Sequence, residues 1–224
     1  MKKILALLFI LIALASAGEF KWARAGFGTD IGVKPEEDAL GALEDDMTFL
    51  VALEAVTTLK VVKKVDIVYV TDLPAMLKYP IIFFQADHIP VFSDQEIKNI
   101  REYLNRGGFI LGDDCVDSST GDFFFQGFKD IIETRIFPEG KMVKLEKTHD
   151  IFKNVNKFPE GMPHTQGINN GAWAYFDDKG RMKIFLSSSD LHCGWHNNQP
   201  WFGEEKHLQM VQMGVNIIIY ALSH

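Results

Sequence analysis

The stretch Arg106-Gly107-Gly108-Phe109-Ile110-Leu111-Gly112-Asp113-Asp114-Cys115 runs from a helix stop through a short apolar strand into two acidic residues and a thiol. Its glycines end a helix, and its central residues are apolar enough for a buried strand. In open α/β sheets, ligands bind beyond the carboxyl ends of the strands. Asp113, Asp114 and Cys115 are therefore expected at a functional edge. The alternative is that the acidic pair only caps the next helix.

The segment before this stretch has the pattern of a capped helix. Ser93-Asp94-Gln95-Glu96 is a capping box, in which serine and glutamate each satisfy a backbone amide. Apolar residues follow it at helical spacing, namely Ile97, Ile100 and Leu104. Helix, glycine stop, strand and polar tip make one αβ unit.

The rest of the chain alternates between the same two kinds of element. Helices are expected over about 40–56, 124–132 and 204–222, and strands over 20–25, 66–70, 81–84, 142–145, 174–176 and 182–186. Asp177 to Gly180 is expected to be the turn of a hairpin. This order predicts an α/β fold, a three-layer sandwich around a mostly parallel sheet, with a C-terminal hairpin and helix.

Polar residues follow several of the expected strands. Parallel strands place their carboxyl ends at one edge of the sheet, so these residues are expected to converge. The predicted ligand-binding residues are His88, Asp113, Asp114, Asp190, His192 and Trp195. Imidazole and carboxylate groups also suit Zn, Fe, Ni or Mn, so His88, Asp114, His192 and His196 are candidate metal ligands, although no cofactor is firmly implied. The alternative is that these histidines hydrogen-bond the backbone.

The two cysteines, Cys115 and Cys193, are both expected on loops at one edge of the sheet. A disulfide is chemically permissible after export, and two separate thiols are the alternative. Cysteine catalysis is not favoured, because Asp113 and Asp117 occupy the positions where a Gly-x-Cys-x-Gly nucleophile elbow needs glycine. Adjacent carboxylates also oppose formation of a thiolate. No catalytic residue is assigned.

The N-terminus has the pattern of a secretory signal. Lys2 and Lys3 precede an apolar run and a small-residue cleavage site, so residues 1–17 are expected to be removed after Ala17. The protein is then secreted or periplasmic, with one domain over 18–224 and no membrane span; an uncleaved anchor is the alternative. Losing the two lysines leaves 21 basic against 30 acidic residues and changes the net charge from −7 to about −9. That charge argues against nucleic acid and anionic membrane as partners.

Several segments together resemble the family known as domain of unknown function 4159, of the class I glutamine amidotransferase-like superfamily. They include Lys78 to Phe84, Phe92 to Glu96, Asp113-Asp114, Ser189 to Leu191 with Gly194-Trp195, and Gly214 to Ala221. The resemblance implies a flavodoxin-like α/β sandwich and says little about activity. Where glutaminases of this superfamily carry a cysteine elbow and a downstream His-x-Glu pair, this chain has Asp113-Asp114-Cys115 and no matching pair.

The function expected from the sequence is therefore an exported α/β domain without glutaminase activity. It would bind a small polar ligand or an envelope protein at the carboxyl edge of its sheet. The alternative is a metal-assisted hydrolase that acts on an envelope or extracellular substrate through His88, Asp113, Asp114 and His192.

Overall fold

The computed structural model describes residues 18–27, 35–116, 121–196 and 202–224. The expected signal segment, residues 1–17 with cleavage after Ala17, lies outside these ranges. Among the described helices, none combines the length and the apolar character needed to cross a bilayer.

The described residues form a seven-stranded sheet in the order β2-β1-β3-β4-β7-β6-β5. The first five strands in this order run parallel, and β6 and then β5 are antiparallel to their neighbours. The bounds are β1 Phe20–Gly26, β2 Val61–Tyr69, β3 Ile81–Ala86, β4 Phe109–Asp114, β5 Val143–Lys144, β6 Ala172–Phe176 and β7 Met182–Ser187. The predicted α/β fold with a mostly parallel sheet and a C-terminal hairpin, β6 and β7, is confirmed.

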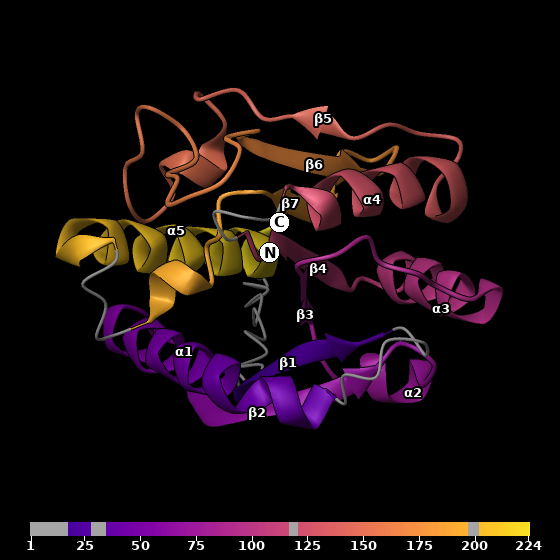
Figure 1. The fold of residues 1–224 in the computed structure, drawn as a ribbon, viewed down its shortest axis with the longest axis horizontal. Helices are drawn as coiled ribbons and strands as arrows, with labels where there is room; N and C mark the ends of the chain where they lie inside the picture. The colour runs from indigo at the N-terminus through magenta and orange to yellow at the C-terminus, as the bar shows by residue number, and fades with distance from the viewer. Residues whose placement is uncertain (1–17, 28–34, 117–120, 197–201) are drawn as a thin grey trace, which may run out of the picture.

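Five α-helices accompany the sheet in the described ranges: α1 Pro35–Val56, α2 Leu73–Met76, α3 Asp94–Asn105, α4 Phe123–Ile131 and α5 Gly203–Ser223. Figure 1 shows α1 and α5 on one side of the sheet and α2, α3 and α4 on the other. Each side has its own apolar core. Phe49 of α1 and Ile217 of α5 belong to one core, and Ile100 of α3 and Phe128 of α4 belong to the other.

Strand β4 contributes alternate residues to the two cores. Phe109 and Leu111 face the core under α1 and α5, whereas Ile110 faces the core under α3 and α4. This is the two-residue period of an extended chain whose two faces are both covered. Continued to the end of the strand, the same alternation directs Asp113 and Asp114 to opposite sides of the sheet.

The predicted capping box and glycine stop are confirmed around α3. Ser93 Oγ accepts a hydrogen bond from the Glu96 amide at 3.3 Å, and the Ser93 amide donates to Glu96 Oε2 at 2.8 Å. Gly107 adopts a φ of +103°, which side chains rarely allow. A Cβ on Gly108 would lie 2.4 Å from the Tyr103 ring, so glycine lets β4 begin directly against α3.

Three elements differ from their expected form. Strand β2 begins at Val61, ahead of the expected start at Asp66, because Lys63 and Lys64 are exposed on an edge strand and hide its apolar pattern. The expected strand over 142–145 is reduced to Val143–Lys144. The short helix α2 was not expected; the Asp72 side chain caps it by accepting from the Ala75 amide.

His149 provides a test of pH-dependent stability outside the sheet edge. Its Nδ1 accepts the Ile151 amide at 3.2 Å and caps the 3-10 turn Asp150–Phe152, so the ring must be neutral. Burial holds its pKa below the ordinary 6.5; His224 and Lys153 act in the same direction, and Asp150 opposes them. The unfolded chain therefore takes up the proton more readily, and native stability falls as the pH drops from about 6.5 through the folded pKa.

We expect His149→Asn to keep the capping acceptor and to lose this part of the acid decline, measured as Tm from about pH 8 to about pH 5. As a control, His149→Ala lacks the acceptor and should be about 1 kcal/mol less stable than the wild type near pH 8, and this difference should shrink toward pH 5 as the wild-type ring is protonated. Equal declines in the wild type and His149→Asn would contradict the assignment.

Candidate functional site

The carboxyl ends of β1, β3, β4 and β7 meet at one edge of the sheet, and Asp113 lies at its centre. Asp113 is fully buried on the α1 and α5 side, opposite Ser187 in the ladder between β4 and β7. Its Oδ1 accepts from Ser187 Oγ at 2.7 Å, and its Oδ2 accepts from the His192 amide at 3.1 Å. Burial raises the pKa of Asp113 well above 3.8, and the charge of Asp190 adds to the rise. Asp113 thus joins β4 to the loop that follows β7.

Asp114 points to the other side of the sheet, toward α4. Its Oδ2 accepts from the Phe125 amide at 2.7 Å, in the first turn of a helix whose N-cap residue, Asp122, makes no side-chain capping bond. The alternative that the acidic pair caps the next helix is therefore correct for Asp114 and wrong for Asp113. Within the described chain, Asp114 Oδ1 is buried without a hydrogen-bond partner. Burial raises the pKa of Asp114 to about 7, with smaller contributions from Asp122, Asp190 and Asp87.

Arg24 of β1 is the centre of a buried polar cluster on the Asp113 side. Its Nε donates to Asp46 Oδ2 at 2.5 Å, its Nη1 donates to Gln85 Oε1 at 3.1 Å, and its guanidinium carbon lies 5.0 Å from the centre of the Phe83 ring. The Asp46 side chain is completely buried and that of Arg24 is 15% exposed. Burial raises the pKa of Asp46, and Arg24 opposes the rise. The ion pair therefore places two opposite charges largely out of contact with solvent.

His192 connects this cluster to Asp113. Arg24 Nη2 lies 2.5 Å from His192 Nε2. A guanidinium can only donate, so Nε2 accepts and the imidazole is neutral in this arrangement. The backbone amide of the same residue bonds to Asp113, so His192 lies between the two groups.

Asp190 has an unusual backbone conformation, with a φ of +53° in a residue other than glycine. Gln166 Nε2 donates to its Oδ2, and Cys193 lies close enough to the carboxylate for its amide and thiol to lower the pKa of Asp190. Within the described residues, its Oδ1 has no hydrogen-bond partner. Burial raises the pKa of Asp190 to about 6, although Gln166 and Cys193 act in the opposite direction.

Trp195 lies below the edge, in the core. Its ring stacks on Phe49, with centroids 4.1 Å apart, and its Nε1 donates to Met210 O at 3.2 Å. It contacts the site through His192, whose ring centre lies 5.7 Å away. Trp195 therefore supports the position of His192.

The candidate metal ligands proposed from the sequence lie in separate pairs. His88 Nδ1 lies 2.8 Å from Asp87 Oδ1 at a largely exposed position, and His196 Nδ1 pairs with Asp45. Among the described residues, no hydrogen bond or ion pair joins His88 to Asp113, Asp114 or His192. The group of metal-ligating side chains found in these ranges is instead Cys115, Asp190 and Cys193. Both cysteines are free thiols.

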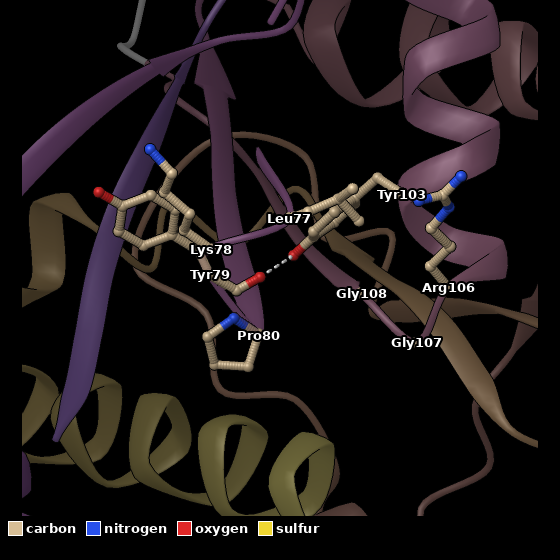
Figure 2. A pocket seen from close by; sticks show the side chains of 8 residues that line it. All are labelled: Leu77, Lys78, Tyr79, Pro80, Tyr103, Arg106, Gly107 and Gly108. Atoms are coloured by element: carbon tan, nitrogen blue, oxygen red, sulfur yellow. Dashed lines mark hydrogen bonds between the residues drawn. The ribbon is translucent and has the colours of Figure 1, made fainter. Parts of the chain in front are cut away.

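A concavity lies at the opposite edge of the sheet, where β3 and β4 begin. Figure 2 shows its lining, formed by Leu77, Lys78, Tyr79, Pro80, Tyr103, Arg106, Gly107 and Gly108. Tyr103 Oη lies 3.1 Å from both Tyr79 O and Phe109 O, to which its one hydrogen can be donated, and it accepts the Phe109 amide at 3.3 Å, so its polar atom is already used. None of the residues predicted for the site lines it.

Several residues of the edge were missed by sequence reasoning. They come from four different parts of the chain: Arg24 from β1, Asp46 from α1, Gln85 from β3 and Gln166 from a turn-rich loop. No regular spacing in the sequence relates them. One signal was available, since Arg24 is a charged residue within an otherwise apolar stretch of its strand. A cation there requires a partner from another element.

Comparison with known proteins places the chain in a family. The family model described as Domain of unknown function (DUF4159) matches residues 41–222. The chain belongs to the DUF4159 family. No curated protein matches this DUF4159 chain. The matched range includes β2 to β7 and most of α1 and α5, and therefore Asp46, Asp113, Asp190 and His192; Arg24 lies before it.

The Arg24–Asp46 pair gives a test of the site's electrostatics. Arg24→Met leaves the buried Asp46 carboxylate without its guanidinium and should cost about 3–5 kcal/mol in the free energy of unfolding. The double variant Arg24→Met with Asp46→Asn removes both charges, so we expect it to recover part of that loss. Urea unfolding measures both values. Arg106→Met, which breaks an exposed pair with Glu102, is the matched control and should cost less than about 1 kcal/mol.

Proposed function

We propose that this DUF4159 protein is an exported α/β domain of the class I glutamine amidotransferase-like superfamily that binds a small polar ligand at the carboxyl edge of its sheet. Export rests on the signal-like residues 1–17, and a single mature domain over 18–224 on the continuous sheet. The strand order supports the superfamily assignment. The five parallel strands have the order β2-β1-β3-β4-β7, which is the flavodoxin-like order 2-1-3-4-5 when only parallel strands are counted.

The observation that carries the proposal is the position of the Arg24 cluster. The chain passes from β1 to β2 on one side and then returns to β3 on the other, so the winding direction changes between β1 and β3. Ligands of open α/β sheets bind in the crevice outside the strand ends at such a switch point. Arg24 comes from β1 and Gln85 from β3, on the two sides of that point.

The chemistry of the edge favours a ligand that donates hydrogen bonds. Asp114 Oδ1 and Asp190 Oδ1 are buried acceptors without a partner in the described ranges, and Ser189 Oγ is also unpaired there. Such groups are costly to bury unless something binds to them. Hydroxyl and ammonium groups are the matching donors, so amino acids, amino sugars and monosaccharides are the ligand classes that fit.

Glutaminase activity is not part of the proposal. The Cys115 amide donates to Ala86 O at 3.0 Å, which continues the parallel ladder from β4 to β3. A nucleophile elbow instead needs a sharp turn at this residue. Asp113 also fills the upstream glycine position and is committed to Ser187 and His192.

A ligand screen tests the proposal. We expect at least one compound from a panel of free amino acids, amino sugars and monosaccharides to raise the Tm of the protein. Asp114→Asn keeps an oxygen for the Phe125 amide but presents an N–H group in place of the second acceptor. It should weaken binding of that compound at least about tenfold by calorimetry.

Asp178→Asn, on the exposed turn of the β6–β7 hairpin, is the matched control and should bind like the wild type. A panel without any hit, or equal binding by Asp114→Asn, would contradict the small-ligand proposal. Ammonia release from glutamine that disappears in Cys115→Ser would contradict the absence of glutaminase activity.

A further inference from the structure

Cys115, Asp190 and Cys193 form a compact group beside the Arg24 cluster. One carboxylate oxygen of Asp190 and the Sγ atoms of both cysteines lie within 4.8 Å of one another. Asp190 is buried and both cysteines are half-buried. No other group of three or more histidine, cysteine or acidic side chains in the described ranges is arranged in this way.

The fold brings these residues together although they are far apart in the sequence. Strands β4 and β7 are parallel neighbours, and Asp113 is opposite Ser187 in their ladder. Cys115 follows two residues after Asp113. The loop after β7 turns back at Asp190 and begins the 3-10 turn Cys193–Trp195. Gln166 binds the Asp190 carboxylate and the Asp190 carbonyl accepts the Gly194 amide, so the third ligand is held in place.

We propose that Cys115, Asp190 and Cys193 bind Zn²⁺ through two thiolates and one carboxylate. Thiolate and carboxylate are two of the ligand types that zinc uses in proteins, and thiolates select it over harder cations. Zinc–sulfur bonds of ~2.3 Å in a tetrahedron hold two sulfurs roughly 3.8 Å apart. That separation is compatible with ligand atoms that all lie within 4.8 Å of one another. The unpaired Asp190 Oδ1 is an oxygen available to the ion. With three protein ligands, the fourth position is left to water or a ligand.

Binding requires the loss of two protons. Each thiol becomes a thiolate bonded to the ion, both protons pass to solvent, and no electron is transferred. The contact with Cys115 and burial, together with the charge of Asp190, raise the pKa of the Cys193 thiol. A divalent cation reverses this effect by stabilising the negative charges that otherwise repel one another.

A disulfide between the two cysteines is the competing state. Its formation removes two electrons and two protons from the thiols and needs an oxidant, such as a disulfide-bearing partner. Both cysteines are free thiols in this structure, which leaves their sulfurs available to a cation. The proposal goes beyond the small-ligand site: Asp190 is common to both sites, but the two sulfur ligands have no part in the small-ligand site.

Metal titration of the full mature chain tests the proposal. The protein is freed of metal, reduced with a phosphine, and titrated with Zn²⁺ against a chromophoric chelator. We expect one ion per chain. Loss of a residue that only hydrogen-bonds a metal ligand weakens metal binding roughly 10- to 100-fold. Cys115→Ser and Cys193→Ser each remove a ligand and should weaken Zn²⁺ binding by more than that. Asp190→Asn should weaken it less, because asparagine tolerates a positive φ and retains one oxygen ligand.

Co²⁺ provides a second readout that does not depend on any variant. In the reduced wild type, Co²⁺ should produce a sulfur-to-metal charge-transfer band. His88→Ala changes an imidazole outside the group and should bind Zn²⁺ like the wild type. Asp114→Asn should also bind Zn²⁺ like the wild type while it weakens binding of the small ligand. The two proposals can therefore fail independently of each other. Absence of the band, unchanged Zn²⁺ affinity in both serine variants, or freshly purified protein with neither zinc nor free thiols would overturn the proposal.

Discussion

The parallel alignment of β1, β3, β4 and β7 is the constraint on which the rest of the structure depends. Helices cover both faces of this sheet, so the middle of each strand must be apolar, and polar side chains gather where the strands end. Strand β4 shows this within six residues, changing from Phe109-Ile110-Leu111 to Asp113-Asp114. Because all four strands run the same way, their polar ends occupy one edge.

The edge combines many carboxyl groups with few cations. Asp46, Asp113, Asp114 and Asp190 are all buried there, and burial raises the pKa of each. Arg24 neutralises one of them directly, and backbone amides or a serine hydroxyl stabilise others. The protein alone does not fully compensate the charge that these carboxyl groups carry when they are ionised. That imbalance favours ligands that donate hydrogen bonds, and cations where sulfur ligands are also present.

Local patterns in the sequence predicted the elements well where propensity and burial agree. The capping box at Ser93, the stop at Gly107, the apolar run of β3 and the β6–β7 hairpin all lie where expected. The pattern failed where tertiary position outweighs local composition. Edge strand β2 tolerates exposed lysines, and β5 is a two-residue strand whose pairing with β6 alone defines it.

Of the candidate site, the sequence predicted the acids that end strands and missed the groups that organise them. Asp113 lies at the end of β4 and accepts the His192 amide from the loop after β7, and the charge of Asp190 acts on Asp113. His88 pairs with Asp87 instead. Arg24 and Asp46 could not be connected from the sequence, since 22 residues separate them and neither belongs to a motif.

The sequence by itself determined the α/β class, the parallel direction of the main strands, and the presence of acids and thiols at their ends. These depend on hydrophobic period and turn chemistry, which act over a few residues. Only the tertiary structure decided which ends are neighbours, and so brought Cys115 against Cys193 and Arg24 against His192. Strand order is set by the packing of whole helices on the sheet, and no short segment of the chain contains that information.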